Sequence, residues 1–398
     1  MAASNFKVKT ILIKDFDFTV GLSQLDYYED VMNPTVIFDV VITDSDGMFS
    51  KLPIVGADPA SVIIEQSIGD KKEIIEYSNE KGNELCVISS SVLPGSKGQV
   101  FKVRLASKDQ LKNETSRVVK KYSGSIGAIV RTILEQDKEL ISTKKDINIG
   151  TITNGYNFIG CMKRPFDVIT WLCPKTENKT KNKDDVGFLF FENKKGYNYI
   201  GVDETLNSDP ELTLYHSNVS LSPFDPNYYY TFSDVQINER TDLLKTLRMG
   251  ALSHYSIFLN MNDLNYSVVT VSSESEIEDL NSVPSRLMYR ILDGGVMEPD
   301  GDQLDEEQLA RNQASAYLRY NLLFTNSMKI TIPFNLQVYA GQIIECNVSA
   351  PTQFRGDSDY DANISGKYMV SKVRHSVQGD NNFSSIELVR DAYDITAT

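Results

Sequence analysis

Histidine and tryptophan are nearly absent from this chain, which has three histidines and one tryptophan in 398 residues. The histidines, His216, His254 and His375, are far in sequence from one another and from every cysteine. A catalytic triad or a zinc site would have to be assembled entirely by the fold, so we interpret them as ordinary surface or core residues. The sequence predicts no catalytic residue, no metal ligand and no cofactor.

Cysteine is scarce as well. The four cysteines, Cys86, Cys161, Cys173 and Cys346, are widely spaced and include no Cys-x-x-Cys pair. This spacing matches neither a compact zinc motif nor a dense disulfide framework. We expect buried, reduced thiols.

Basic residues are outnumbered, because 40 Lys and Arg stand against 54 Asp and Glu, which gives a formal net charge of -14. Nucleic-acid binders gain most of their affinity from Lys and Arg that neutralise phosphates. Specific nucleic-acid binding is therefore not expected. An acidic channel that lets DNA pass without sticking would fit this charge.

Long hydrophobic runs are missing too. No apolar segment approaches the roughly 18 residues that a membrane helix needs, and residues 1–7 contain no apolar leader. We expect a soluble protein made in the cytoplasm, without a membrane partner. A hydrophobic fraction of 41% over 398 residues indicates two or three globular domains.

The first hundred residues have the alternation of β-strands. Polar and apolar residues alternate over 6–13, whereas a longer strand at 35–43 is apolar on both faces and should be covered on both sides. Further strands are predicted at 62–65, 85–91 and 99–106. We assign residues 1–110 to a first, tube-like β-barrel domain.

The pattern changes after a polar stretch at 108–121. Apolar residues at helical spacing predict a helix over 124–140, and a second helix begins at Pro165, since proline suits the first helical position. Lysines mark a solvated loop at 175–185, which leads into a hairpin formed by 187–192 and 197–200. We assign residues 111–223 to an α+β middle domain.

The next segment returns to strands and then becomes acidic. Strands are predicted at 230–237, 256–259 and 267–271, with a short helix at 242–252. Residues 272–305 are rich in acids and turn formers, and we interpret them as an excursion loop that belongs with the middle domain.

The last ninety residues combine one helix with a strand meander. The helix covers 309–324 and is capped by Asp302 or Asp305. Alternation in one of the strands places Tyr368, Val370 and Lys372 on the same face. The strands are predicted at 328–333, 341–349, 367–377 and 384–390. We assign 224–271 together with 306–398 to a second tube-like β-barrel domain.

Two short matches favour duplication of the barrels. Residues 52–54 and 62–65 resemble 336–338 and 343–345, each pairing a bend with a strand that ends in glutamate. The fold class is therefore mainly β, with two similar barrels on either side of an α+β domain. This predicts that residues 309–390 superpose on the first hundred.

Motifs for chemistry are weak throughout. Residues 357–361 alternate acids as a calcium loop does, but Ala362 replaces the glycine of the turn and Tyr368 replaces the bidentate glutamate. Glycine pairs at 95–98 and 124–127 match neither phosphate-binding motif. Paired carboxylates of the glycosidase kind stay open, because many acids are available.

Four segments, taken in order, resemble a known family. They are 122–126 (YSGSI), 164–172 (RPFDVITWL), 187–192 (GFLFFE) and 365–375 (SGKYMVSKVRH). Together with the order of domains they are similar to the central baseplate hub proteins of contractile-tailed bacteriophages, the T-even-type hub family, which is related to the hub part of type VI secretion spike proteins. The resemblance covers most of the chain.

This resemblance implies a homotrimer in which each subunit gives two similar barrels, so that six barrels meet a hexameric tail tube and the middle domains surround a threefold central spike. It implies a structural protein of the virion tail baseplate, assembled in the host cytoplasm, that forms part of the DNA channel. The implied partners are other copies of the chain, the tail tube protein, the central spike protein, baseplate wedge or other hub proteins, and the tape measure protein. No catalytic residue is carried over, so no enzyme is expected.

Two alternatives remain. The chain resembles equally the hub of another contractile injection or type VI-like secretion machine, and a cell-wall polysaccharide hydrolase is the alternative from a different class. Candidate interface residues lie in two loops: Phe354, Arg355 and Tyr360 in one, Lys179 and Lys181 in the other. Each loop is also compatible with simple solvation.

Overall fold

A computed structural model describes residues 6–44, 47, 54–93, 99–179, 185–217, 221–223, 225, 227–239, 242–261, 264–273, 283–296, 305–349, 360–361 and 363–391. Strands hold 48% of the described residues and helices 19%. The mainly β class predicted from the sequence is therefore confirmed.

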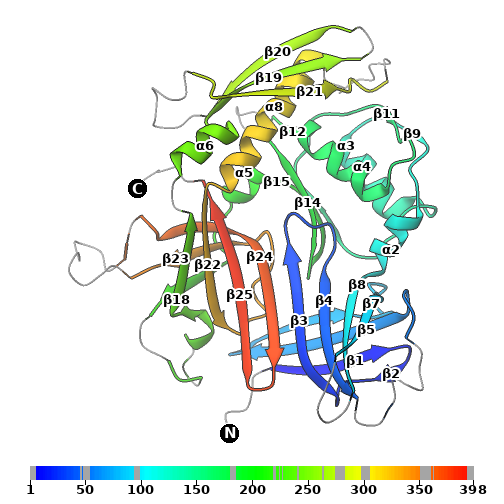
Figure 1. Cartoon of the computed structure of the whole chain (residues 1–398), viewed down its shortest axis with the longest axis vertical. Coiled ribbons are helices and arrows are strands. Elements are labelled where there is room, and N and C mark those ends of the chain that lie inside the picture. Colours follow the sequence, from blue (N-terminus) through cyan, green and yellow to red (C-terminus); the bar gives the residue numbers. More distant parts are fainter. Residues whose placement is uncertain are drawn as a thin grey trace.

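Strands from both ends of the chain form one large sheet, which has 15 strands in the described part of the chain. Its N-terminal half follows the order β2-β1-β5-β7-β8-β4-β3, with β6 paired to β5, and is drawn in blue to cyan in Figure 1. The strands of this half are β1 (Phe6–Ile13), β2 (Phe16–Asp17), β3 (Leu22–Asp30), β4 (Ile37–Asp44), β5 (Pro59–Ile68), β6 (Lys71–Tyr77), β7 (Leu85–Leu93) and β8 (Gln99–Ser107).

The C-terminal half continues the same sheet on the other side of β3. Strand β24 pairs with β3, β23 and β25. On one side β23 continues to β16 and β17, and on the other β25 continues to β22 and β18. The strands of this half are β16 (Leu212–His216), β17 (Thr231–Phe232), β18 (Asp234–Glu239), β22 (Asn326–Pro333), β23 (Ile343–Asn347), β24 (Gly366–Gln378) and β25 (Asn381–Arg390).

The two halves join where β24 runs antiparallel to β3, from Lys372 opposite Asp30 to Val377 opposite Leu25. Arg374 supports this junction, because its guanidinium lies 3.0 Å from a carboxylate oxygen of Asp26. Pairing across the junction makes the described strands one open sheet. Among the described strands, neither half closes on itself by hydrogen bonds, so the closed barrels expected from the sequence are not seen.

A β-bulge in β24 changes which side chains share a face. The register against β25 shifts between Val370 and Lys372, and a bulge inserts one unpaired residue into the alternation. Tyr368, Val370 and Val373 are all buried in one cluster, whereas Lys372 is exposed. The prediction that Tyr368, Val370 and Lys372 share a face was therefore wrong at Lys372.

Each half of the sheet packs around its own hydrophobic cluster. The N-terminal cluster is built mainly from β1, β3, β4, β5, β7 and β8 and includes the fully buried Tyr27 and Phe38. The C-terminal cluster is built from β16, β22, β23, β24 and β25 and includes Ile330 and Ile386. Two separate cores explain why the sequence gives two strand-rich regions.

The middle of the chain folds into short helices around a small sheet of β10, β15 and β14. The predicted hairpin is confirmed as β14 and β15, and the helix predicted from Pro165 begins there. The helix predicted over 124–140 is shorter: α3 is followed by a π-helical turn, Thr132–Gln136, and ends where Asp137 becomes extended. The elements are α2 (Lys108–Thr115), β9 (Lys121–Tyr122), α3 (Ile126–Arg131), β10 (Ile147–Ile149), β11 (Phe158–Ile159), α4 (Pro165–Leu172), β12 (Glu177–Asn178), β13 (Asp185–Val186), β14 (Phe188–Asn193), β15 (Gly196–Gly201) and α5 (Val202–Leu206).

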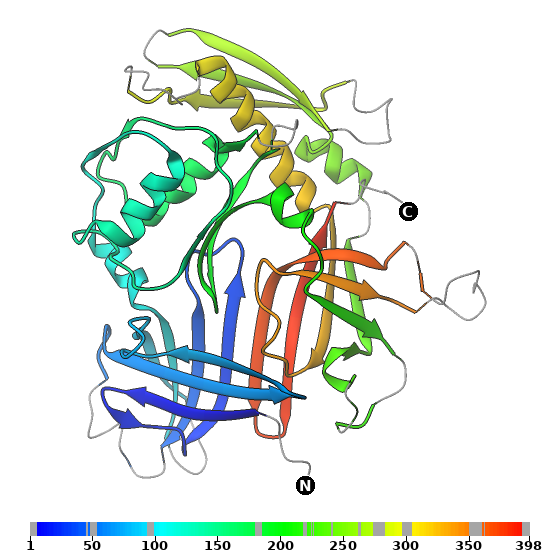
Figure 2. The same ribbon diagram turned by 180° about the vertical axis from the view of Figure 1, so that it is seen from behind.

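A separate three-stranded sheet lies at the opposite end of the molecule from the N-terminus, with α8 packed beneath it (Figure 1, Figure 2). Its central strand β19 pairs antiparallel with β20 and parallel with β21. Asp305 caps α8 by accepting a hydrogen bond from the Gln308 amide, as one of the two predicted caps. The elements are α6 (Leu243–Met249), β19 (Ser253–Asn260), β20 (Tyr266–Ser272), β21 (Arg286–Leu292) and α8 (Glu306–Leu323).

This sheet differs from the sequence prediction in two ways. The expected excursion loop at 272–305 contains the strand β21, and the strands expected at 256–259 and 267–271 lie outside the large sheet. The physical reason is burial: Phe258 and Val269 pack in one cluster with Leu309 of α8. The domain boundaries drawn from the sequence remain a prediction. In the described part of the chain, no helix has the length and apolar character that a membrane crossing requires.

Candidate functional site

The three histidines do not form a site. Within the described ranges, no group of three His, Cys, Asp or Glu side chains could hold a metal ion. His375 is fully buried in β24, where one ring nitrogen lies 2.8 Å from the Ser384 hydroxyl and the other 3.1 Å from the Val338 carbonyl. Burial lowers the pKa of His375 to about 3. It is a neutral core residue with both nitrogens satisfied.

The cysteines are all free thiols. Cys86, Cys173 and Cys346 are buried, as expected, but Cys161 is exposed. Cys161 follows strand β11 in a turn between short elements, and such a turn has no core to cover its side chain. The expectation of buried thiols was therefore wrong at this position.

The candidate interface residues from the sequence belong to different parts of the fold. Tyr360 is 40% exposed and forms a β-bridge with Ser349 beside β23. Lys179 is exposed beside β12, and its ammonium lies 2.8 Å from the buried carboxylate of Glu177. Phe354, Arg355 and Lys181 lie outside the described residues. Tyr360 and Lys179 therefore lie beside different strands, and the proposed role of the five positions in an interface stays a prediction.

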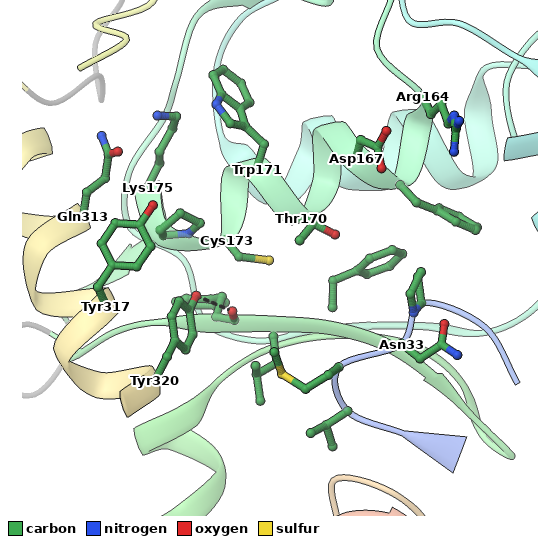
Figure 3. Close-up of a pocket in the computed structure, with 18 of the residues that line it drawn as sticks. Asn33, Arg164, Asp167, Thr170, Trp171, Cys173, Lys175, Gln313, Tyr317 and Tyr320 are labelled. Carbon is green, nitrogen blue, oxygen red and sulfur yellow. Dashed lines mark hydrogen bonds between the residues drawn. The ribbon is translucent and has the colours of Figure 1, made fainter. Parts of the chain in front are cut away.

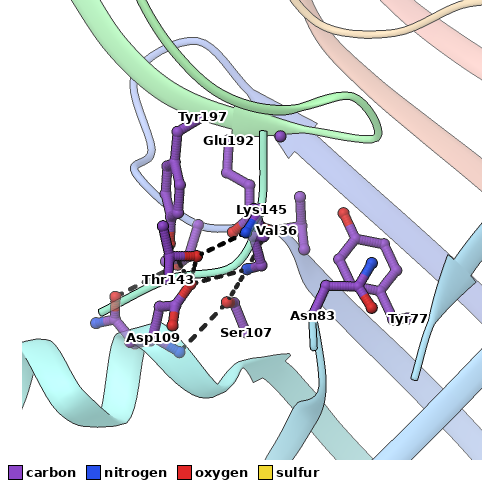
Figure 4. Close-up of polar contacts among 12 residues, drawn as sticks. Val36, Tyr77, Asn83, Ser107, Asp109, Thr143, Lys145, Glu192 and Tyr197 are labelled. Carbon is purple, nitrogen blue, oxygen red and sulfur yellow. Dashed lines mark hydrogen bonds and ion pairs between the residues drawn. The ribbon is translucent and has the colours of Figure 1, made fainter. Parts of the chain in front are cut away.

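A buried polar cluster joins the N-terminal half of the large sheet to the middle of the molecule (Figure 4). Lys145 lies at its centre, 2.6 Å from Glu192 and 3.2 Å from Asp109, and it also donates to the hydroxyl of Ser107. Thr143 donates to Asp109 at 2.9 Å. These residues come from β8, α2, β14 and the connection before β10.

The charges of this cluster are fixed by burial and pairing. Burial raises the pKa of Glu192, and the nearby Lys145 lowers it only in part. Burial by itself lowers the pKa of Lys145, but Glu192 and Asp109 outweigh that effect and raise it. Side chains that are almost completely buried and satisfied by each other cannot reach a substrate. The cluster therefore acts as a structural clamp.

The outer face of the β19–β20–β21 sheet is apolar and exposed, and we call it the apolar face. Its rows follow from the register: Ile257 lies opposite Val268 and Tyr289, and Leu259 opposite Tyr266 and Ile291. Exposure reaches 73% at Tyr266 and Tyr289. The apolar face comprises Tyr255, Ile257, Leu259, Tyr266, Val268, Leu287, Tyr289 and Ile291.

Sheets of soluble proteins normally bury one apolar face and expose a polar one. Here the inner face already packs against α8, through Phe258 and Val269 among others. Exposed apolar patches of this extent are typical of interaction surfaces. Sequence reasoning missed it because β21 was assigned to a loop. The alternation of Leu287, Tyr289 and Ile291 with Arg286 and Arg290 was the signal that could have revealed it.

The overall fold is shared with solved structures of tail proteins, two of them from prophages, which align over nearly the whole of this chain. The resemblance seen in the sequence is thereby confirmed for the fold. No family model and no curated protein matches the sequence.

Three solved structures align with this chain over nearly its whole length. A tail protein from Neisseria meningitidis MC58 aligns with a TM-score of 0.58 and 13% identity, over 98% of each chain. The 43 kDa tail protein of prophage MuSo2 from Shewanella oneidensis aligns with a TM-score of 0.55 and 10% identity, over 98% of this chain and 99% of that one. A prophage tail protein from Listeria monocytogenes EGD-e aligns with a TM-score of 0.52 and 10% identity, over 97% and 96%.

Proposed function

We propose that this chain is a structural protein of the phage tail, the trimeric hub of the baseplate. It adapts a sixfold tail tube to a threefold central spike and lines part of the channel through which DNA leaves. The observation that carries this proposal is the match of the fold, over 98% of both chains, to solved tail proteins.

The two halves of the large sheet support a threefold-to-sixfold adaptor. Each half is built mainly around its own core, and the two join along the strand pair β3 with β24 and through Phe334 and Leu336, which pack into the N-terminal core. Three chains would then present six sheet units to a hexameric tube. In this proposal the halves play the part of the two tube-like units predicted from the sequence.

The charge of the chain fits a channel for DNA. A net charge of -14 per chain becomes more negative in a trimer, and an acidic wall repels the phosphate backbone. DNA could pass such a wall without binding. The proposed partners are the tail tube, the central spike, baseplate wedge or other hub proteins and the tape measure protein, and the proposed location is the virion tail.

The apolar face supplies a contact between copies of the chain. Chains that each carry a charge of -14 repel one another, so a contact surface should be free of charge. The register places Thr270 as the ninth position of this face, and none of its nine positions is charged. In a threefold ring this face meets a different surface of the neighbouring copy, since cyclic trimers use heterologous contacts.

A polysaccharide hydrolase finds no support in the described carboxyl groups. Burial raises the pKa of Glu29 to about 7, as in a general acid, but Glu29 is 2% exposed and holds the backbone amides of Lys194 and Ala340. Glu192 is equally enclosed. The hub of another contractile injection or type VI-like machine is the alternative within the structural class. Labelling of purified phage tails with an antibody against this chain separates the two.

Light scattering followed by electron microscopy tests the proposal. The expected mass is three times that of the 44.7 kDa chain, unchanged in high salt because apolar contacts are not screened. The expected image is a ring with a central hole, whose obligate interfaces each bury more than about 2,000 Å². A chain that stays monomeric at micromolar concentration overturns the proposal.

A further inference from the structure

A groove of about 910 Å³ lies between α4 and β14, and no part of the proposed hub function uses it (Figure 3). The β3–β4 turn borders one end, with Asn33 in view, and α8 borders the other with Gln313, Tyr317 and Tyr320. Strand β21 completes the wall. The volume suits a short stretch of extended polypeptide.

A buried hydrogen-bond donor and a buried cation lie at the α8 end of the groove. The Gln313 side chain is 4% exposed, and its amide nitrogen has no hydrogen-bond partner in the described structure. Lys175 is 2% exposed, and its ammonium lies over the rings of Trp171, at 4.5 Å from the centroid, and Tyr156, at 5.4 Å, but forms no ion pair with any described carboxylate. Buried donors that remain unpaired are costly, and most buried polar groups are satisfied.

The same end of the groove carries a second cation. Arg290 of β21 stacks over the ring of Tyr317, 3.6 Å from the ring centroid, and forms no ion pair among the described residues. Asp293 faces the site as well, but its carbonyl and carboxylate accept from the Tyr156 hydroxyl at 2.7 and 3.4 Å. Donors and positive charge therefore exceed acceptors at this end.

The pKa of Lys175 also indicates that its charged form lacks an anion. Burial lowers its pKa to about 8, with Lys163 adding to this and Asp293 opposing it. A lysine in this position costs folding free energy unless an anion joins it. An arriving carboxylate would restore the charged form and satisfy both donors.

The floor of the groove offers backbone groups to an extended chain. Strand β14 is the last strand of its sheet and pairs only with β15 in the described structure. In an antiparallel pair, every second residue directs its N–H and C=O groups towards the partner strand. The Val202 amide donates to the Gly187 carbonyl, so Phe188 and Phe190 direct their N–H and C=O groups away from β15. The Tyr320 hydroxyl indeed reaches the Phe188 carbonyl at 2.7 Å from that side. The groups of Phe190 remain for an added strand.

We propose that this groove binds an extended acidic peptide segment of a partner protein. A carboxylate of the segment sits between Lys175 and Gln313, within reach of Arg290, and the peptide backbone runs along the free edge of β14. The inference goes beyond the proposed hub function, because the groove belongs to a single chain and exists whether or not three chains assemble.

Selection from a library of random heptapeptides displayed against the full wild-type chain provides the probe. We expect the selected peptides to be enriched in Asp or Glu at one position flanked by apolar residues. One selected peptide is then synthesised with a fluorescent label, together with the version that carries Asn or Gln at that position. Anisotropy titration should show the neutral version binding at least about tenfold more weakly, as expected for a lost charge-assisted hydrogen bond.

Three variants assign this binding to the groove. Lys175→Met and Gln313→Glu should each weaken the acidic peptide at least about tenfold, the first by removing the charge and the second by placing a carboxylate beside Lys175. Lys179→Met is the matched control, because Lys179 follows in the same segment but pairs with Glu177 outside the groove. It should leave the affinity unchanged.

Thermal unfolding separates a binding role from a structural one. Lys175→Met should keep or raise Tm, because it removes a buried charge that forms no ion pair with a described carboxylate, and Gln313→Glu should also raise it by pairing with Lys175. Selection without enrichment in acids, or equal affinity of the groove variants and wild type, overturns the inference. Light scattering of each variant shows whether assembly persists, so failure of the groove and failure of the trimer are read independently.

Discussion

The ammonium of Lys145 lies 2.6 Å from a carboxylate oxygen of Glu192, and their side chains are only 5% and 0% exposed. Lys145 precedes β10, Glu192 lies on β14, and the Val36 amide just before β4 donates to the other oxygen of Glu192 at 3.3 Å. This pair therefore ties the middle of the chain to the N-terminal half of the large sheet. Its removal should loosen both parts together.

Lys145→Met should destabilise the protein by about 3–5 kcal/mol, because it leaves Glu192 and Asp109 as buried carboxylates without their cation. Unfolding in urea, followed by circular dichroism, measures the loss. Adding Glu192→Gln should recover part of it, since one uncompensated charge disappears. Lys108→Met removes an exposed pair with Glu84 and serves as the control, with an expected loss below about 1 kcal/mol. Equal losses in the two single variants contradict the clamp.

His375 should make the protein sensitive to acid. Its pKa is about 3 in the fold, below the ordinary value of 6.5, so the unfolded chain takes up a proton that the folded chain refuses. Stability should fall as the pH drops from 6.5 towards 3, by up to about 1.4 kcal/mol per pH unit. In His375→Gln this component should vanish, which urea midpoints at pH 6.5, 5.5 and 4.5 would show. Parallel pH profiles of variant and wild type would contradict the assignment.

Glu29 should make the protein less stable as the pH rises, which is the opposite of the effect of His375. Burial raises its pKa to about 7 from the ordinary value of 4.5, while hydrogen bonds from Tyr27, Ala340 and Lys194 reduce the shift. The folded chain then holds a proton that the unfolded chain has lost, so stability should fall as the pH rises from 4.5 to 7. Glu29→Gln should remove this slope. Urea midpoints of the wild type and of Glu29→Gln at pH 5 and pH 7.5 test this. If the midpoint changes between the two pH values by the same amount in both proteins, the raised pKa is refuted.

Much of the fold was accessible to sequence reasoning because its signals are local. Alternation located β1, and Pro165 located the start of α4. Asp302 or Asp305 was predicted to cap the C-terminal helix, and Asp305 is the cap of α8. These signals depend on neighbours within a few residues, and the physics of caps and periodicity acts at that range.

The missing parts depend on contacts that are distant in sequence. The pairing of β24 with β3 joins residues more than three hundred positions apart, and nothing local shows that it opens the expected barrels into one sheet. The bulge near Ser371 likewise arises between strands. The groove takes Lys175 from the middle and Gln313 from α8, so only the fold brings them together. The superposition of residues 309–390 on the first hundred stays a prediction.

One thiol should react in the native protein. Cys161 is exposed, whereas burial raises the pKa of Cys86, and raises that of Cys173 to about 12. The thiolate is the reactive form, so buried thiols with raised pKa react slowly. A chromogenic disulfide reagent at pH 8 should titrate one thiol per chain before denaturation and four after it. Cys161→Ser should abolish the fast reaction, and more than one fast thiol in the wild type would contradict the burial of the other three.

Val268→Lys should prevent assembly without unfolding the chain. Val268 is 54% exposed at the centre of one edge of the apolar face, opposite Ile257, and a lysine there places a charge in a surface that must lose its water on contact. Light scattering should report a monomer, while circular dichroism should keep the β-rich spectrum of the wild type, because the side chain points to solvent in the single chain. Tm should fall only by the stabilisation that assembly provides. Ile74→Lys is the matched control, since Ile74 is 43% exposed on β6, away from this face. It should remain trimeric. If Val268→Lys still forms trimers, the contact between copies lies elsewhere, and if both variants dissociate, added charge alone disrupts the ring.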